Sequence, residues 1–488
     1  MQAAAGGASV YGIPGVVDAV ERDDAGLQPD RRTLPFTRGW LLLAVAALGL
    51  SGIYTVLVVA SRVPYLGEVF PWADSFQVAV VVHVVLSIVV WLFAFGAVIW
   101  CLTTRPVALP VAWSALTLAV LGTVVMSVTP FVDPAPPVMS DYVPVLDSPL
   151  FLTGLALFGL GLAVLVGWAL SAPKPVGPAP YGRPAVLRFG AHTALVAGAL
   201  TLVAFVWSFS QLTPSAMEGQ PYYQTLFWGS GHIAQFAFTQ LLLVAWLWLA
   251  WASGLRLPMT PRVAMGFLLL GIVPTFLTPW VYLAFDVTDV GHTLSMTWMM
   301  IFGGGIAALP IGLAVALALG RGKTEKTETP LGDGHVLRSG LVLSVALFGL
   351  GGVLGFLISG SNLLIPAHYH GSITGVSLAF MALSYHLLPS FGFAVPPLRL
   401  AAWQVYIYGI GQLIHVTGLA WSGGHNVQRK TAGADQGLEA LAEILGMIVM
   451  GVGGAIAIVG GALYIIVVAK SVLPSLRGTV TERSVGNH

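Results

Sequence analysis

Four histidines lie within stretches of sequence that are otherwise almost entirely apolar: His83, His232, His368 and His370. A histidine inside an apolar helix is costly unless it is paired, hydrogen-bonded or bound to a metal. Its neutral imidazole is also a common ligand of iron, copper and zinc. A hydrogen bond to a neighbouring backbone group explains any single one of these residues about equally well. Four of them at similar depth favour a layer of metal ligands.

The spacing of His368 and His370 indicates two separate centres. Residues two apart project about 200° apart around a helix, so their side chains leave it on opposite faces. One helix can then hold two hemes, each through one imidazole nitrogen, and His83 is free to be the second axial ligand of one of them. His232 remains for a non-heme metal. The pattern therefore predicts two hemes and one further metal.

The composition of the chain is that of a membrane protein. Its 488 residues are 57% hydrophobic and only 8% charged, with a mean hydropathy of +0.86, whereas about a quarter of the residues of a soluble domain are charged. A membrane-spanning helix needs about 20 apolar residues. The hydropathy pattern predicts an all-α membrane protein, a bundle of about twelve transmembrane helices near residues 39–60, 76–101, 107–131, 150–171, 189–211, 227–253, 262–286, 290–320, 339–359, 367–391, 401–422 and 438–470.

The distribution of charges predicts the topology. With a cytoplasmic N-terminus, most Lys and Arg residues of the connections fall on the cytoplasmic side, as the positive-inside rule requires. We expect residues 1–37 to be a cytoplasmic N-terminal tail, 38–470 a single transmembrane catalytic domain and 471–488 a cytoplasmic C-terminal tail. The first tail has no signal-peptide pattern, so we expect the first span to be the anchor. The four histidines then lie in the outer half of the membrane.

The single cysteine, Cys101, limits the redox chemistry of the chain. It excludes structural disulfides, a CxxCH site for covalent heme and a two-thiolate copper centre within this chain. Electrons must therefore arrive from a partner. Nothing in the sequence indicates a nucleic-acid partner.

The runs around these histidines resemble the catalytic subunit, subunit I, of the heme-copper oxidase superfamily. The similar segments are Ala-His-Tyr-His-Gly-Ser-Ile at 367–373, Trp-Gly-Ser-Gly-His at 228–232, and His83. The resemblance covers nearly all twelve predicted spans. It implies that His83 and His370 ligate a low-spin heme, that His368 is the proximal ligand of a high-spin heme, and that His232 binds a non-heme copper or iron.

The resemblance extends to the segment 423–430, whose family counterpart uses paired bases to contact heme propionates. Arg429 and Lys430 would fill that role here. The resemblance also implies a place in a respiratory electron-transport chain, in the prokaryotic cytoplasmic (inner) membrane. The electron donor would be a small subunit of subunit II type, cytochrome c or quinol, and the substrate NO or O2.

The sequence departs from oxygen-reducing members at the end of the seventh predicted span. Those members carry an adjacent histidine pair there, and the corresponding positions here are Phe285 and Asp286. Asp286 would supply a carboxylate ligand, and His292 a further imidazole if the segment folds back. A carboxylate oxygen favours iron over copper. The alternative is that Asp286 and Asp289 simply begin a solvated loop.

The tyrosine of the oxidases is also missing from its usual places. The position four after His232 is Phe236, the counterpart in the seventh span is Pro279, and Tyr282 is out of register. Family oxidases draw one of four electrons from that tyrosine, whereas coupling two NO molecules to N2O needs only two electrons. Gln235, one turn after His232, would orient the metal site or a bound diatomic, or be a polar helix contact.

The favoured reading is an atypical nitric oxide reductase. The alternative is a cytochrome c or quinol oxidase that reduces O2 to water, with an altered copper site and a relocated tyrosine. A third possibility is a membrane heme protein without catalysis, such as an electron conduit that has lost its second metal. Metal content separates this third class from the enzymes, because a conduit needs hemes but no further metal.

Overall fold

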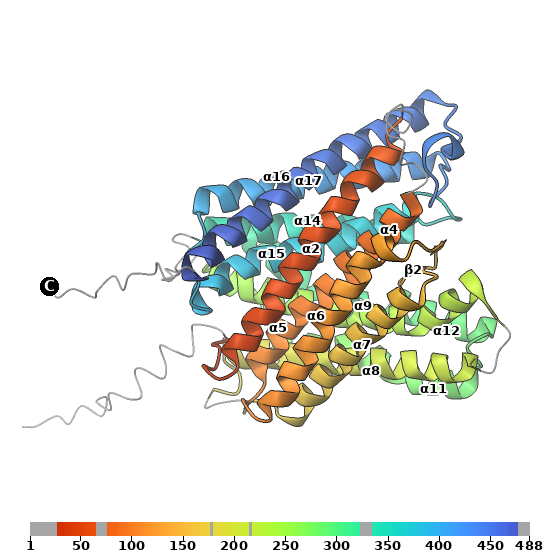
Figure 1. Ribbon diagram of the computed structural model, residues 1–488. Helices are drawn as coiled ribbons and strands as arrows, with labels where there is room; N and C mark the ends of the chain where they lie inside the picture. The colour runs from red at the N-terminus through yellow and green to blue at the C-terminus, as the bar shows by residue number, and fades with distance from the viewer. Residues whose placement is uncertain (1–26, 65–75, 176–178, 214–216, 323–333, 477–488) are drawn as a thin grey trace, which may run out of the picture.

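The structure is a computed structural model, and it describes residues 27–64, 76–175, 179–213, 217–322 and 334–476. These residues form an all-α membrane bundle, as predicted, whose long helices lie side by side (Figure 1). The two strands in the described ranges are short, β1 (Pro137–Val138) and β2 (Val145–Leu146), and they pair antiparallel. They form a small ribbon in the connection that follows α6.

The helices follow one another with short connections, because apolar stretches alternate with brief polar or Pro/Gly segments. Their bounds are α2 Leu34–Arg62, α4 Phe76–Val84, the π-helix η2 Val85–Val90, α5 Trp91–Thr103, α6 Leu109–Val132, α7 Pro149–Ser171, α8 Arg183–Leu212, α9 Gly219–Ala252, α10 Pro261–Ile272, the 3-10 helix η3 Val273–Leu277, α11 Thr278–Ala284, α12 Val290–Gly303, α13 Gly305–Arg321, α14 His335–Phe356, α15 Leu364–Ser390, α16 Leu398–Gly424, the 3-10 helix η4 Gly433–Gln436 and α17 Leu441–Leu476.

Eleven candidate membrane spans, some made of consecutive helices, are found among the described residues. The remaining predicted span, 401–422, corresponds to α16, whose 27 residues reach about 40 Å at 1.5 Å per residue. It is less apolar because Gln404, Gln412 and His415 interrupt it. The bundle therefore has the predicted spans, with edges shifted by a few residues.

The largest shift is at α9, which begins at Gly219 rather than near 227. Its first two turns are polar, so the hydropathy pattern places the start of the span later than the start of the helix. The helical part also exceeds the predicted 38–470, because α2 starts at Leu34, with a proline in its first turn, and α17 continues to Leu476.

The spans that carry the four histidines are the best shielded from the surroundings. In the most apolar 18 residues of each span, 89% of α9, 83% of α15 and 61% of the span formed by α4, η2 and α5 are buried, against 33–50% in the other candidate spans. Helices far apart in sequence close the bundle around them. For example, α2 lies against α17 (Figure 1).

Close packing of α14 on α15 positions one of the histidines. A Cβ at Gly371 would come within 2.7 Å of the Cα atom of Gly351, so the two backbones can approach this far only because both residues are glycine. The approach brings the carbonyl oxygen of Gly351 next to the side chain of His368.

Candidate heme and metal centre

A cavity of about 2660 Å³ runs through the interior of the bundle. Pockets for ordinary small ligands measure about 300–1,000 Å³, so this cavity has room for more than one large group. Most of its lining is apolar. Its histidines come from four different spans: His83, His232, His368, His370 and His415.

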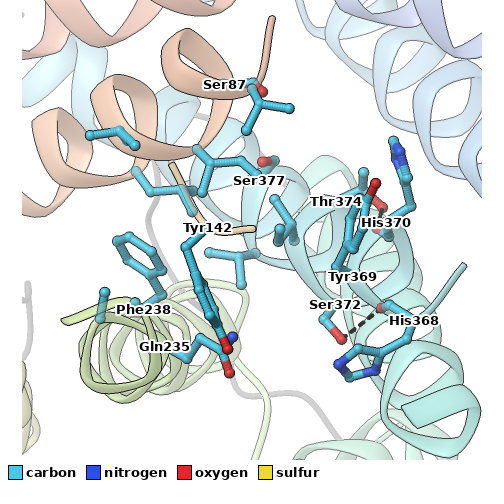
Figure 2. A pocket seen from close by; sticks show the side chains of 18 of the residues that line it. Ser87, Tyr142, Gln235, Phe238, His368, Tyr369, His370, Ser372, Thr374 and Ser377 are labelled. Atoms are coloured by element: carbon cyan, nitrogen blue, oxygen red, sulfur yellow. Dashed lines mark hydrogen bonds between the residues drawn. The ribbon is translucent and has the colours of Figure 1, made fainter. Parts of the chain in front are cut away.

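His368 and His370 leave α15 in different directions, as their spacing predicted (Figure 2). The Nδ1 atom of His368 lies 2.7 Å from the carbonyl oxygen of Gly351. Because that carbonyl can only accept, Nδ1 carries the hydrogen and Nε2 is left as the free acceptor nitrogen. A metal-binding imidazole is commonly held in this way by a bond to its other nitrogen.

His83 is held in the same manner from α2. Its Nδ1 atom lies 2.8 Å from the hydroxyl oxygen of Ser51 and 2.9 Å from that of Thr55, which leaves Nε2 for the cavity. The π-helix η2 starts two residues later, and the Ser87 hydroxyl within it donates to the backbone oxygen of His83 at 2.6 Å. Short π-helical turns occur frequently at functional sites.

His415 was missed in the sequence analysis. It lies in α16, its Nδ1 atom is 2.9 Å from the carbonyl oxygen of Met450, and its ring centroid is 4.9 Å from that of His370. His83 is also near enough to interact electrostatically with both. The rule that selected the other four histidines, an imidazole within an apolar span, applies equally to His415.

His232 lies in α9 and faces a tyrosine. Its Nδ1 atom is 2.8 Å from the carbonyl oxygen of Trp228, one turn earlier. The hydroxyl of Tyr142, from the connection between β1 and β2, lies 3.0 Å from Nε2 and 3.1 Å from Nδ1. The same hydroxyl reaches the side chain of Gln235 (Figure 2). Gln235 therefore contacts the group that faces His232.

His292 lies in α12, fully buried, and neither ring nitrogen has a hydrogen-bond partner among the described residues. Its ring centroid is 4.8 Å from that of Tyr282, and it is near enough to His232 for electrostatic interaction. Tyr282 does not supply the missing partner, because its hydroxyl bonds Ser208 at 2.8 Å and the Ala204 carbonyl at 3.0 Å. A buried polar group without a partner requires an explanation, and a metal ion is one.

Asp286, unlike His232 and His292, is not buried. It is exposed in the turn after α11, where its backbone N–H donates to the Asp289 carboxylate at 3.1 Å. In the described part of the chain, no three side chains of His, Cys, Asp or Glu are grouped closely enough to hold a metal ion. The structure thus brings His292 toward His232 but does not bring Asp286 to them, and the role of Asp286 stays a prediction.

Arg429 and Lys430 line the cavity and converge on Asp141. Arg429 Nη1 lies 3.1 Å and Lys430 Nζ 2.9 Å from the same carboxylate oxygen, and the Gln224 amide donates to the other oxygen at 3.0 Å. Burial alone would raise the pKa of Asp141, but the hydrogen bonds and charges of Lys430 and Arg429 outweigh it and hold the pKa below its usual value. Asp141 is therefore ionised at neutral pH.

Two relatives of this chain span most of its length. No family model matches the sequence. An uncharacterised protein of Rickettsia prowazekii (strain Madrid E) is 28% identical, covering 88% of this chain and 95% of the relative. An uncharacterised protein of Aquifex aeolicus (strain VF5) is 27% identical, covering 72% of this chain and 85% of the relative.

A solved structure of a heme-copper terminal oxidase dimer matches the fold, with a TM-score of 0.63 and 18% identity, over 93% of this chain and 84% of the other. The bundle therefore has the fold of a heme-copper terminal oxidase.

Proposed function

We propose that this protein is the catalytic subunit of a membrane-bound respiratory oxidoreductase of the heme-copper type, and that it reduces nitric oxide to nitrous oxide. The observation that carries the proposal is the set of cavity histidines whose Nδ1 atoms are bonded to carbonyl or hydroxyl oxygens: His83, His232 and His368. Each thereby presents Nε2 to one shared cavity within an oxidase fold.

The residues fit two hemes and one further metal. His83 and His370 would ligate the low-spin heme, His368 the high-spin heme, and His232 and His292 a non-heme copper or iron, with Asp286 as a further candidate ligand. The two unpartnered nitrogens of His292 favour its role as a ligand. When bound, the hemes would supply one-electron transfer, and the high-spin heme with its neighbouring metal would bind the diatomic substrate.

The protein side chains have simpler tasks. Backbone carbonyls fix the tautomers of His232 and His368, and two hydroxyls engage Nδ1 of His83, so Nε2 of each is free for a metal. The apolar lining keeps water out of the centre of the bundle. At the mouth of the cavity, Arg429 and Lys430 place two positive charges against one carboxylate, Asp141. The excess positive charge suits heme propionates.

Phe236 and Pro279 occupy the positions at which the oxidases carry a tyrosine, and this difference favours NO as the substrate. Two NO molecules with two electrons and two protons give N2O and water, whereas O2 needs four electrons and four protons to give two waters. A second candidate function, O2 reduction to water, is favoured by one observation, because the Tyr142 hydroxyl lies 3.0 Å from His232. It would be the relocated phenol that this alternative requires.

We further propose that the N-terminus is cytoplasmic, so that Asp141, Arg429 and the histidine layer lie toward the outer face of a prokaryotic inner membrane. The connections with several bases then face the cytoplasm. Electrons would arrive from a small subunit of subunit II type, cytochrome c or quinol. Accessibility labelling of Asp141→Cys, in a variant whose Cys101 has been replaced, would overturn this topology if the new thiol reacted only from the cytoplasmic side.

The experiment that tests the function is turnover of the purified, artificially reduced protein with NO and, separately, with O2. Optical spectra and metal analysis of the same sample would first count the hemes and the non-heme metal. N2O formation with negligible O2 uptake supports the reductase, and rapid O2 uptake supports the oxidase. Hemes without a further metal and without either turnover would instead identify an electron conduit, and protein without heme would contradict the whole proposal.

A further inference from the structure

The connection between β1 and β2 inserts an aromatic side chain toward the candidate metal centre. At its tip, Tyr142 has a φ of +63°, in the left-handed region. That conformation is an outlier for a bulky residue and persists only where surrounding contacts enforce it. Something in the structure must therefore hold Tyr142 in place.

The first feature that holds Tyr142 is the space left in α9 by a residue without a side chain. The ring of Tyr142 lies where a Cβ of residue 231 would be, and this position is Gly231. The Trp228 ring, one turn earlier, packs edge to face against it with centroids 5.8 Å apart. Any larger residue at 231 would push the phenol away from His232.

The second feature that holds Tyr142 is the group formed by Asp141, Arg429 and Lys430, which we call the clamp. Arg429 donates to both carboxylate oxygens, at 3.1 and 3.3 Å, and Lys430 donates to Asp141 at 2.9 Å and to the backbone oxygen of Met139 at 2.7 Å. The clamp fixes the backbone on both sides of position 140, directly before Tyr142. It joins this connection to the segment that follows α16.

The result is a phenol hydroxyl fixed beside the His232 ring. His232 commits Nδ1 to the Trp228 carbonyl, so Nε2 is its free acceptor, and the Tyr142 hydroxyl lies 3.0 Å from Nε2 and 3.1 Å from Nδ1. Gln235 is the other side chain that the hydroxyl reaches. A metal ion bound at Nε2 would take that acceptor from Tyr142, and the phenol O–H would then be available as a hydrogen-bond donor next to His232.

We propose that Tyr142 is a catalytic residue that donates a hydrogen bond to the diatomic ligand at the second metal, and that the clamp and Gly231 position it. The inference rests on the proposed function, because it requires a metal on His232. It assigns Arg429 and Lys430 a task besides any contact with propionates. In either reaction at least one substrate oxygen leaves as water, so a fixed donor at that oxygen would stabilise the charge that develops on it.

The test uses carbon monoxide bound to the reduced holoprotein and the C–O stretching band in the infrared, which responds to a nearby hydrogen-bond donor. Tyr142→Phe should shift this band and lower turnover by roughly 10²-fold, with heme and metal contents unchanged. The matched control is Tyr223→Phe, which removes a phenol from the lining of the same cavity and should keep the wild-type band.

Two further variants keep the phenol but disturb its position. Gly231→Ala, which would crowd the Tyr142 ring, and Asp141→Asn, which weakens the clamp, should both move the band toward that of Tyr142→Phe. The low-spin heme spectrum should stay unchanged and serves as the control for folding.

A wild-type band in Tyr142→Phe would overturn the inference, and so would loss of the non-heme metal from that variant, because Tyr142 would then be a ligand rather than a donor. Failure of the proposed function looks different. In that case the wild-type protein itself would bind neither carbon monoxide nor a non-heme metal.

Discussion

The imidazole of His415 meets that of His370 edge to face, with ring centroids 4.9 Å apart. His83 lies close to both rings. Two histidines from different spans, α4 and α16, are therefore candidates for the second axial ligand of the heme on His370. Both have Nδ1 engaged, His83 with Ser51 and Thr55 and His415 with a backbone carbonyl.

We predict that His83 is the ligand and His415 a neighbour of the heme. His83→Ala should abolish the low-spin heme spectrum, and His415→Ala should retain it with a shifted reduction potential, because a polar group beside the ligand changes the electrostatics of the heme. Optical spectra and redox titration of both purified variants check this. If His415→Ala lost the low-spin spectrum and His83→Ala kept it, His415 would be the axial ligand and His83 the neighbour.

A prediction for the high-spin heme follows from the packing of α14. A Cβ at Gly355 would approach Nδ1 of His368 to 2.7 Å, so Gly355→Ala should turn or displace the imidazole. We expect it to reduce the high-spin heme signal strongly, as His368→Ala should abolish it, while the low-spin heme stays. Gly167→Ala in α7, where a Cβ meets nothing within 4 Å, is the control and should leave both spectra unchanged.

The helical bundle and the inward position of His83, His232, His368 and His370 could be predicted because each rests on local signals. Apolar stretches of about 20 residues reveal a span, and the opposite directions of His368 and His370 follow from helix geometry. The contact between Asp141 and Arg429 could not be predicted in this way, because the two are 288 positions apart. For the same reason Tyr142, which the clamp places beside His232, carried no signal in the sequence.

The non-heme metal gives a further prediction. His292 is buried with both ring nitrogens unpartnered, and a metal bond would satisfy one of them. His232→Ala and His292→Ala should each lose the non-heme metal and turnover while both heme spectra persist. Metal analysis and optical spectra of the same samples decide the matter. His292→Ala with its full metal content would show that the buried imidazole has only a packing role.

Asp286 can be tested separately. We predict that Asp286→Ala abolishes turnover and keeps both hemes, because a carboxylate ligand holds the second metal but not the hemes. Asp289→Ala is the matched control in the same exposed turn and should retain turnover. Since Asp286 is exposed in this structure, its role requires the turn to move inward when the metal binds. Unchanged turnover in Asp286→Ala would show that Asp286 is part of a solvated loop and not a metal ligand.

The clamp makes the stability of the protein depend on pH in a defined direction. Arg429 and Lys430 hold the pKa of Asp141 below its usual value, against the effect of burial. A carboxyl group whose pKa is lowered by folding stabilises the folded state above its unfolded pKa of about 3.9, and this contribution is lost as the pH falls through the folded pKa. The clamp is therefore intact at neutral pH and weakens only in acid.

Asp141→Asn should lower the stability of the protein at pH 7 by on the order of 2 kcal/mol, the usual worth of hydrogen bonds to charged groups. The difference between variant and wild type should begin to shrink near the unfolded pKa of about 3.9 and should be lost only when the pH has fallen through the lowered folded pKa of Asp141. Thermal melting followed by heme absorbance at several pH values measures this. Asp147→Asn, at an exposed position of the same connection, is the control and should melt like the wild type throughout. A difference of constant size from pH 7 to acid would contradict the ionic clamp, because only an ionised Asp141 binds Arg429 and Lys430 in this way.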